Sequence, residues 1–248
     1  MKTLFLSFCF SLFLLGVPPV LATTLTAYPD PDPETSTVDG VVKNEIAATT
    51  WATIHDDLTG SGIDSTNSAT YFGYLSAGVS ADTWNGINKG VYLFDTSSIG
   101  SDVIESSTLT VTTNNPGSEN FASAVIYVNV YSSAPATNTA LVTGDFDSFG
   151  TTPFSDDLQI TGVLDETAYD FVLNADGLAA ISTSGITKLG GRTVSDATNT
   201  PPTHTASASA YITVYNAEAA GTTTDPKLVV VHNAPGPGTK HLQVIIIE

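Results

Sequence analysis

The chain has 248 residues, a formal net charge of −18 and a single cysteine, Cys9. Such an acidic chain is a poor partner for nucleic acid or for an anionic membrane surface, because both require clustered positive charge. Its 42% share of hydrophobic residues and its nine tyrosines argue against disorder and predict a folded chain with a sizeable core.

Residues 1–22 have the features of a signal peptide. Lys2 precedes the apolar run Leu4–Leu15, and Val20-Leu21-Ala22 offers a small-residue cleavage site. Gly16 and two nearby prolines end the apolar run too early for a spanning helix, so we expect no membrane insertion after cleavage. We therefore expect a secreted, extracellular or cell-surface protein that has lost Cys9, and with it any disulfide or cysteine–zinc site.

The rest of the chain is a series of short segments rich in β-branched and aromatic residues, and each segment predicts a strand. Several alternate between two kinds of side chain, as expected when one face of a strand is buried. The expected strands are Thr24–Tyr28, Thr49–Ile54, Thr70–Leu75, Gly90–Asp95, Thr108–Thr112, Ala124–Tyr131, Tyr169–Leu173, Ile186–Leu189, Ala208–Tyr215 and Lys227–Val231, and Val38–Val41 carries a hairpin signal.

Turn and loop residues separate these strands. The expected turns and loops are Asp39-Gly40, Leu58–Asn67, Asn85-Gly86, Asn114–Gly117 and Thr193–Thr205. Helical signals are weak, and the clearest is Asn174–Ile181, which predicts one or two helical turns with Asn174 as the N-terminal cap.

About ten short strands with almost no helical periodicity predict an all-β fold. We expect an antiparallel β-sandwich of jelly-roll type with one or two short helical turns. One sandwich domain is expected over residues 23–232, and residues 233–248 follow as a Pro/Gly linker and a C-terminal strand.

The predicted central strand carries a resemblance to a known family. The residues that match are Lys89–Asp95, Ile99, Ile104–Leu109, Tyr169–Phe171, Leu173-Asn174, Gly177-Leu178, Ile181, Gly185 and Asp225–Val230. They resemble the DNRLRE-type domain, a disaggregatase-related carbohydrate-binding β-sandwich, over roughly residues 28–231. Lys89 stands where that family usually has Arg, and Ser107 where it usually has Ala. The resemblance implies a non-catalytic module, in some cases a glycan-binding one, and it carries over no catalytic residue.

Catalytic and metal-binding signals are sparse. No serine-nucleophile elbow, zinc-hydrolase motif or phosphate-binding loop occurs, so we expect no enzymatic activity. His55-Asp56-Asp57, the one dense titratable cluster, is more typical of the start of a solvated loop than of a metal or acid–base site. Oxygen ligands are plentiful, so a structural calcium ion is the metal that the sequence favours. The acidic pairs considered for it are Asp30 with Asp32 and Asp145 with Asp147, although neither pair has the spacing of a calcium loop.

Flat aromatic side chains near the surface can stack on sugar rings. The candidates for such glycan contacts are Trp84, Tyr71, Tyr74 and Trp51. Trp84 is the strongest of them because it stands beside the expected turn Asn85-Gly86, whereas Trp51 is more typical of a core residue. We therefore expect a non-catalytic module that binds extracellular polysaccharide or a surface glycan.

The end of the chain supports an alternative. Its apolar run consists of Val244, Ile245, Ile246 and Ile247 and follows the Pro/Gly linker. Such a run is typical of a strand that pairs either with its own sheet or with the open edge of a neighbouring subunit. Pairing between subunits would make the protein a self-associating structural subunit of an extracellular filament or surface layer.

Overall fold

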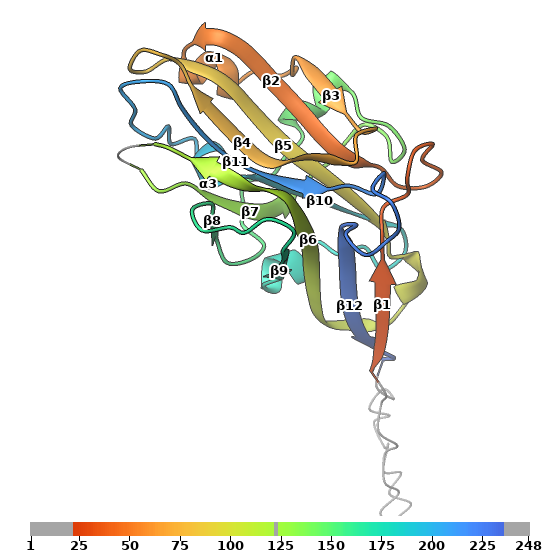
Figure 1. Cartoon of the computed structure of the whole chain (residues 1–248). Coiled ribbons are helices and arrows are strands. Elements are labelled where there is room, and N and C mark those ends of the chain that lie inside the picture. The colour runs from red at the N-terminus through yellow and green to blue at the C-terminus, as the bar shows by residue number, and fades with distance from the viewer. Residues whose placement is uncertain (1–21, 122–123, 236–248) are drawn as a thin grey trace, which may run out of the picture.

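The computed structural model describes residues 22–121 and 124–235, and this part of the chain is all-β and antiparallel, as predicted. Twelve strands form one connected sheet that curls into a half-barrel, which gives a sandwich-like fold (Figure 1). The strands are β1 (Thr23–Ala27), β2 (Asp39–Thr49), β3 (Gly62–Asp64), β4 (Ala69–Ala77), β5 (Trp84–Asp95), β6 (Val103–Glu119), β7 (Tyr127–Ser132), β8 (Leu158–Gln159), β9 (Ala168–Val172), β10 (Ile186–Thr193), β11 (Ala208–Tyr215) and β12 (Lys227–Asn233). The connections contain the helices α1 (Trp51–His55), α2 (Ala175–Ala179) and α3 (Val194–Ala197) and the 3₁₀ turns η1 (Ser97–Ile99) and η2 (Thr143–Asp147).

The strand order is β1-β12-β6-β11-β4-β5-β10-β7-β8, with β9 paired to β6, β2 to β5, and β3 to β2. β6 joins the two parts of the sheet, because its first part pairs with β12 and β9 and its last part pairs with β11. β1 and β12 lie side by side at the lower end of the molecule (Figure 1). The curl of the sheet therefore depends on one long strand of 17 residues.

β5 is the strand around which the functional residues are arranged. β2 covers one of its edges, while β4 and β10 share the other, so the sheet forks beside β5. Glycines allow this close approach, since a Cβ added to Gly191 would lie 2.6 Å from the carbonyl oxygen of Phe72. Substitution of this glycine would therefore push the two branches of the fork apart.

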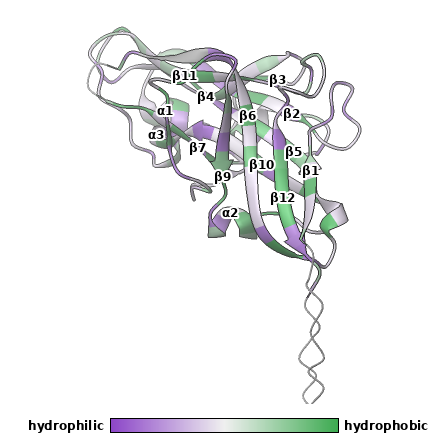
Figure 2. Ribbon diagram, turned by 60° about the horizontal axis from the view of Figure 1, so that its bottom comes forward, coloured by the Kyte–Doolittle hydropathy of each residue, from purple (hydrophilic) through white to green (hydrophobic). Residues whose placement is uncertain are grey.

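An aromatic stack links the two parts of the core. The ring of Phe72 lies 5.7 Å from that of Tyr92 and 5.0 Å from that of Phe171, measured between centroids. Hydrophobic residues also follow much of β12 (Figure 2), where Leu228 and Val230 are fully buried. In the described part of the chain no helix is long and apolar enough to cross a bilayer.

The structure confirms several local predictions. β11 has the predicted bounds Ala208–Tyr215. Asn174 caps α2, because its side chain accepts hydrogen bonds from the backbone N–H groups of Asp176 and Gly177, both at 3.0 Å. The predicted C-terminal strand, Val244–Ile247, and residues 1–21 of the predicted signal peptide lie outside the described residues.

Other local predictions are wrong because tertiary pairing overrides local signals. Most of the predicted strand Thr49–Ile54 is α1, which Thr50 caps by accepting a hydrogen bond from the backbone N–H of Thr53 at 3.2 Å. The predicted turns Asn85-Gly86 and Asn114–Gly117 lie inside the long strands β5 and β6. The predicted loops Leu58–Asn67 and Thr193–Thr205 are mostly irregular, as predicted, but they also contain the short elements β3 and α3.

Candidate functional site

Two of the residues expected to contact glycan, Tyr71 and Tyr74, lie together on the outward face of β4. Residues three apart on a regular strand point to opposite faces. Here Gly73 pairs with Ile212 and Tyr71 with Thr213, so the residue between them is an extra, bulged residue. The bulge returns both tyrosines to the same face, with their ring centroids 4.7 Å apart and their planes 31° from parallel.

Tyr211 of β11 completes a cluster that we call the tyrosine platform, consisting of Tyr71, Tyr74 and Tyr211. Tyr211 pairs directly with Tyr74, and its ring centroid lies 5.6 Å from that of Tyr71 and 6.1 Å from that of Tyr74. All three rings are partly exposed. Gly86 of β5 provides room for the platform, because a Cβ there would lie 2.7 Å from Cε1 of Tyr74.

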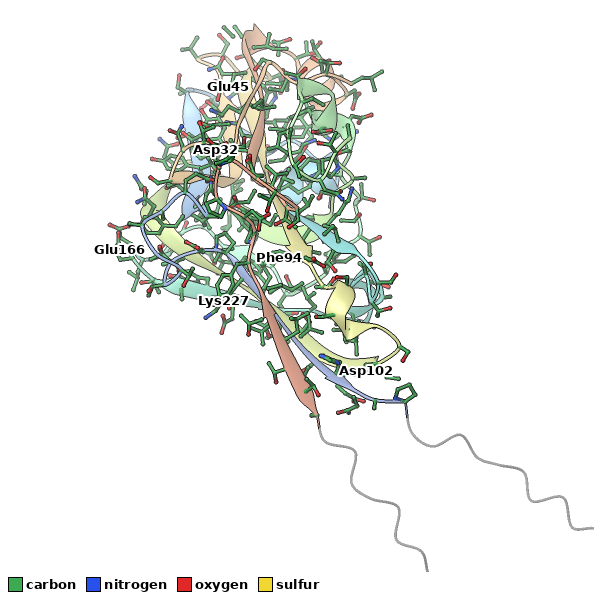
Figure 3. The ribbon with its side chains drawn as sticks, turned by 90° about the vertical axis from the view of Figure 1, so that its right-hand side faces the viewer. Asp32, Glu45, Phe94, Asp102, Glu166 and Lys227 are labelled. Carbon is green, nitrogen blue, oxygen red and sulfur yellow. The ribbon has the colours of Figure 1, made fainter. Side chains whose placement is uncertain are left out.

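A polar hollow lies at each end of the platform. The hollow beside Tyr71 has a volume of about 230 Å³, and its polar lining includes Lys43, Asp64, Asn67 and Thr213. The hollow beside Tyr74 has a volume of about 250 Å³, and its polar lining includes Ser76, Asn85, Asn120, Ser207 and Ser209. The exposed Glu45 lies beside Gly86, because a Cβ there would lie 3.6 Å from Cγ of Glu45, and Figure 3 shows Glu45 near the end of the molecule opposite β1 and β12.

The two tryptophans lie elsewhere. Trp84 is only 1% exposed, because it lies within β5 and packs against Trp51, Phe121 and His204 at centroid distances of 4.8, 6.1 and 4.8 Å. The expectation that Trp84 stands in an exposed turn is therefore wrong, and its ring is not available to a sugar. Trp51 is partly exposed at α1, where its indole Nε1 donates to Asn199 at 2.6 Å.

A second cluster on the opposite face of β5 brings together buried charges. Lys89 of β5 and Arg192 of β10 are 3% and 4% exposed, and Asp196 of α3 is completely buried between them. The Arg192 Nε donates to Asp196 Oδ2 at 2.5 Å, and the Lys89 Nζ lies 3.8 Å from Asp196 Oδ1. Nζ of Lys89 also donates to the carbonyl of Phe146 at 3.0 Å and lies 3.8 Å from the centroid of that ring.

These charges border a hollow of about 270 Å³ that we call the cationic hollow. Its lining residues are His55, Lys89, Asp147, Phe149, Thr151, Arg192, Ala197 and Asn199. Nε2 of His55 makes a hydrogen bond of 2.9 Å with the carbonyl oxygen of Asp196, which fixes the ring at the rim. His55 is therefore the last residue of α1 and packs against α3, whereas Asp56 and Asp57 follow the helix and begin the predicted loop.

The pKa values of Lys89 and Asp196 are both lowered, but for different reasons. Desolvation lowers the pKa of Lys89 to about 8, against the attraction of Asp196. Burial alone would raise the pKa of Asp196, but the charges of Lys89 and Arg192 overcome this effect and hold it below its usual range. At neutral pH the cluster thus contains two buried cations and one fully buried carboxylate.

Acidic side chains surround a hollow of about 520 Å³, which we call the acidic hollow, between the segment after β1 and the loop before β12. Asp32, Glu218 and Asp225 line it, and Asp39 is buried nearby. Desolvation raises the pKa of Asp225 to about 6, and it raises the pKa of Glu218 as well. For Asp39, desolvation and the nearby charge of Glu218 raise the pKa well above its ordinary value.

The acidic residues considered for calcium have separate positions. Asp30 Oδ2 accepts hydrogen bonds from Thr35 and Ser36, and the carboxylate of Asp145 accepts from the backbone N–H groups of Ala136 and Val142, both at 2.8 Å. These two carboxylates therefore stabilise loops. Asp32 lines the acidic hollow and Asp147 the cationic hollow. Across residues 22–121 and 124–235, no three His, Cys, Asp or Glu side chains are arranged to hold a metal ion.

Sequence reasoning missed Tyr211, Arg192 and Asp196 as site residues. The signal for Tyr211 was available, because it shares one face of the alternating segment Ala208–Tyr215 with other polar residues. The signal for the charged cluster was weaker. Arg192 is the only arginine in the sequence, but nothing local shows that it faces Lys89.

No family model matches the chain, and no curated protein matches it either. The similarity to the DNRLRE-type domain therefore stays a prediction, and arguments about function depend on the geometry described above.

Proposed function

We propose that the protein is an exported, non-catalytic module that binds a polysaccharide or surface glycan on its tyrosine platform. The observation that carries this proposal is the outward cluster of Tyr71, Tyr74 and Tyr211 between two polar hollows. Aromatic faces stack on the apolar C–H faces of sugar rings, and polar groups beside them bind hydroxyls and set orientation. A platform with hollows at both ends suits a chain of sugars better than a single sugar.

The hydrogen-bonding capacity of the site agrees with this ligand. The three platform tyrosines are partly exposed, and a phenolic hydroxyl can both donate and accept a hydrogen bond with a ligand. The hollows add hydroxyls and amides such as Ser209 and Asn85, with one charged pair, Lys43 and Asp64, whose closest N–O distance is 3.4 Å. This mostly neutral lining favours a neutral or weakly charged glycan.

Binding to a polysaccharide array tests the proposal with the secreted chain and three single variants. Tyr71→Ala and Tyr74→Ala are each expected to weaken binding about tenfold, since loss of one aromatic contact costs about 1.4 kcal/mol. Tyr127→Ala removes a comparably half-buried tyrosine from β7 and should bind as the wild type does. Equal binding by all four proteins, or equal losses in all three variants, would contradict the platform.

A second proposal is that the protein is a subunit of an extracellular filament. In the described residues β1 pairs only with β12, so its other edge is open, and Thr23 pairs with His232 where β12 ends. An open edge of this kind can accept a strand from another copy. The apolar run at the end of the sequence would supply that strand.

Deletion of Lys240–Glu248 tests the assembly proposal. We expect the full chain to form assemblies that light scattering and electron microscopy detect, and the deleted chain to remain monomeric. A full chain that stays monomeric at high concentration, or a deletion that assembles normally, would rule out pairing through this segment.

A further inference from the structure

The cationic hollow is unusual in a protein with so little positive charge. The whole sequence has seven Lys and Arg residues against 25 Asp and Glu, yet two of the seven, Lys89 and Arg192, are buried side by side. Burial of a cation is costly unless it is fully paired. An arrangement that brings two of them together therefore needs a compensating partner.

The protein supplies only part of that compensation. Asp196 is the one fully buried carboxylate of the cluster, and its Oδ2 is paired with Arg192. Its Oδ1 has no hydrogen-bond partner among the described residues, because Lys89 Nζ and His55 Nε2 lie 3.8 and 3.7 Å away. Lys89 has three N–H donors and uses one of them on the carbonyl of Phe146. Asp147, exposed at the rim, adds a second negative charge near Lys89, but the N–H donors of Lys89 and Arg192 that face the hollow are not all used by the protein.

The unsatisfied donors border a space that a ligand can enter. The cationic hollow of about 270 Å³ is far larger than one water, which occupies about 30 Å³. Phe149 provides an aromatic wall, while Thr151 and Asn199 provide polar groups at the rim. The guanidinium of Arg192 uses Nε on Asp196 and Nη1 on the carbonyl of Gly150, and its planar fork suits an oxyanion.

We propose that the cationic hollow binds the carboxylate of a small sugar acid, with Lys89 and Arg192 pairing to the carboxylate and Phe149 packing against the sugar ring. Thr151 and Asn199 would then bind hydroxyl groups. The site is separate from the tyrosine platform. Asn88 donates to Glu45 on the platform side of β5, and the next residue, Lys89, therefore points to the opposite face.

Calorimetric titration of the mature chain with glucuronate, galacturonate, glucose and sodium sulfate tests this proposal. At least one uronate is expected to bind, glucose is not, and the affinity should fall at least tenfold in Lys89→Met, because a charge-assisted hydrogen bond is lost. Lys227→Gln removes one positive charge from β12, which contributes no residue to the lining of the hollow, and should bind as the wild type does.

Several outcomes would overturn the proposal. They are no binding of either uronate, equal binding of glucose, binding of sulfate alone, or equal losses in Lys89→Met and Lys227→Gln. Amide NMR shifts on titration of the wild type locate the site even where Lys89→Met fails to fold. The shifts should centre on residues 149–151 and 197–199, and shifts confined to other regions would refute the assignment.

These outcomes are independent of the platform. If the Tyr71→Ala variant loses polysaccharide binding but retains uronate binding, the loss is due to the platform alone. If the Lys89→Met variant loses uronate binding but retains polysaccharide binding, the loss is due to the cationic hollow alone.

Discussion

At Lys89 the requirements of binding and of stability conflict. Its ammonium is buried and shares Asp196 with Arg192, and desolvation lowers its pKa to about 8. A group of this kind destabilises the fold while it is charged, because the unfolded chain holds the proton more tightly. A destabilising buried charge of this kind is typical of a residue that serves ligand binding rather than the stability of the fold.

Lys89→Met should therefore stabilise the protein at pH 7. Met fills a similar volume without the desolvation cost, while Arg192 still pairs with Asp196, so we expect a gain of about 1 kcal/mol in the free energy of unfolding. The gain should shrink between about pH 8 and 10.5, because wild-type Lys89 loses its proton in the folded state first and wild-type stability rises over that window. Urea denaturation at pH 7 and pH 9.5 measures both effects, and a destabilised variant with no pH dependence would show that Lys89 is a purely structural ion-pair partner.

At the scale of the element, the sequence predicts regular strands well and their irregular features poorly. The strict alternation of Ala208–Tyr215 gives β11 its exact bounds, because one face packs on the core and the other does not. The bulge between Tyr71 and Gly73 arises from pairing with β11, and no local pattern encodes it. For the same reason, Tyr71 and Tyr74 could be named from the sequence but their shared face could not.

Long-range pairing also explains why one candidate was misplaced and one site was missed. Asn85-Gly86 is a good turn signal in isolation, but in the fold Gly86 makes room for the ring of Tyr74 and the strand continues through it. Trp84 is consequently buried. The contact of Lys89 with Arg192 and Asp196 depends on the fork in the sheet, where β10 lies against β5, and two isolated segments of sequence cannot reveal it.

At the scale of the whole molecule, two groups of carboxylates respond to pH in opposite directions. Asp39, Glu218 and Asp225 have raised pKa values, mainly through burial, so their ionisation destabilises the fold at neutral pH. They bind protons more tightly in the folded chain, and stability therefore rises as pH falls toward about 4. Asp30 and Asp196 have lowered pKa values, so the stability that they contribute is lost below that range.

The melting temperature should therefore be highest between about pH 4 and 6 and lower at pH 8. Asp225→Asn removes the ionisable group whose pKa is about 6 and keeps its shape, so the variant should melt at a higher temperature than the wild type at pH 8 and at the same temperature near pH 4. After a discount for solvent screening, the gain at pH 8 should be about 1 kcal/mol. Asp165→Asn, at an exposed position after β8, provides the matched control and should leave the profile unchanged. Calorimetric melts of the three proteins from pH 4 to 8 measure these differences, and parallel profiles for the wild type and Asp225→Asn would show that the acidic hollow does not govern the pH response.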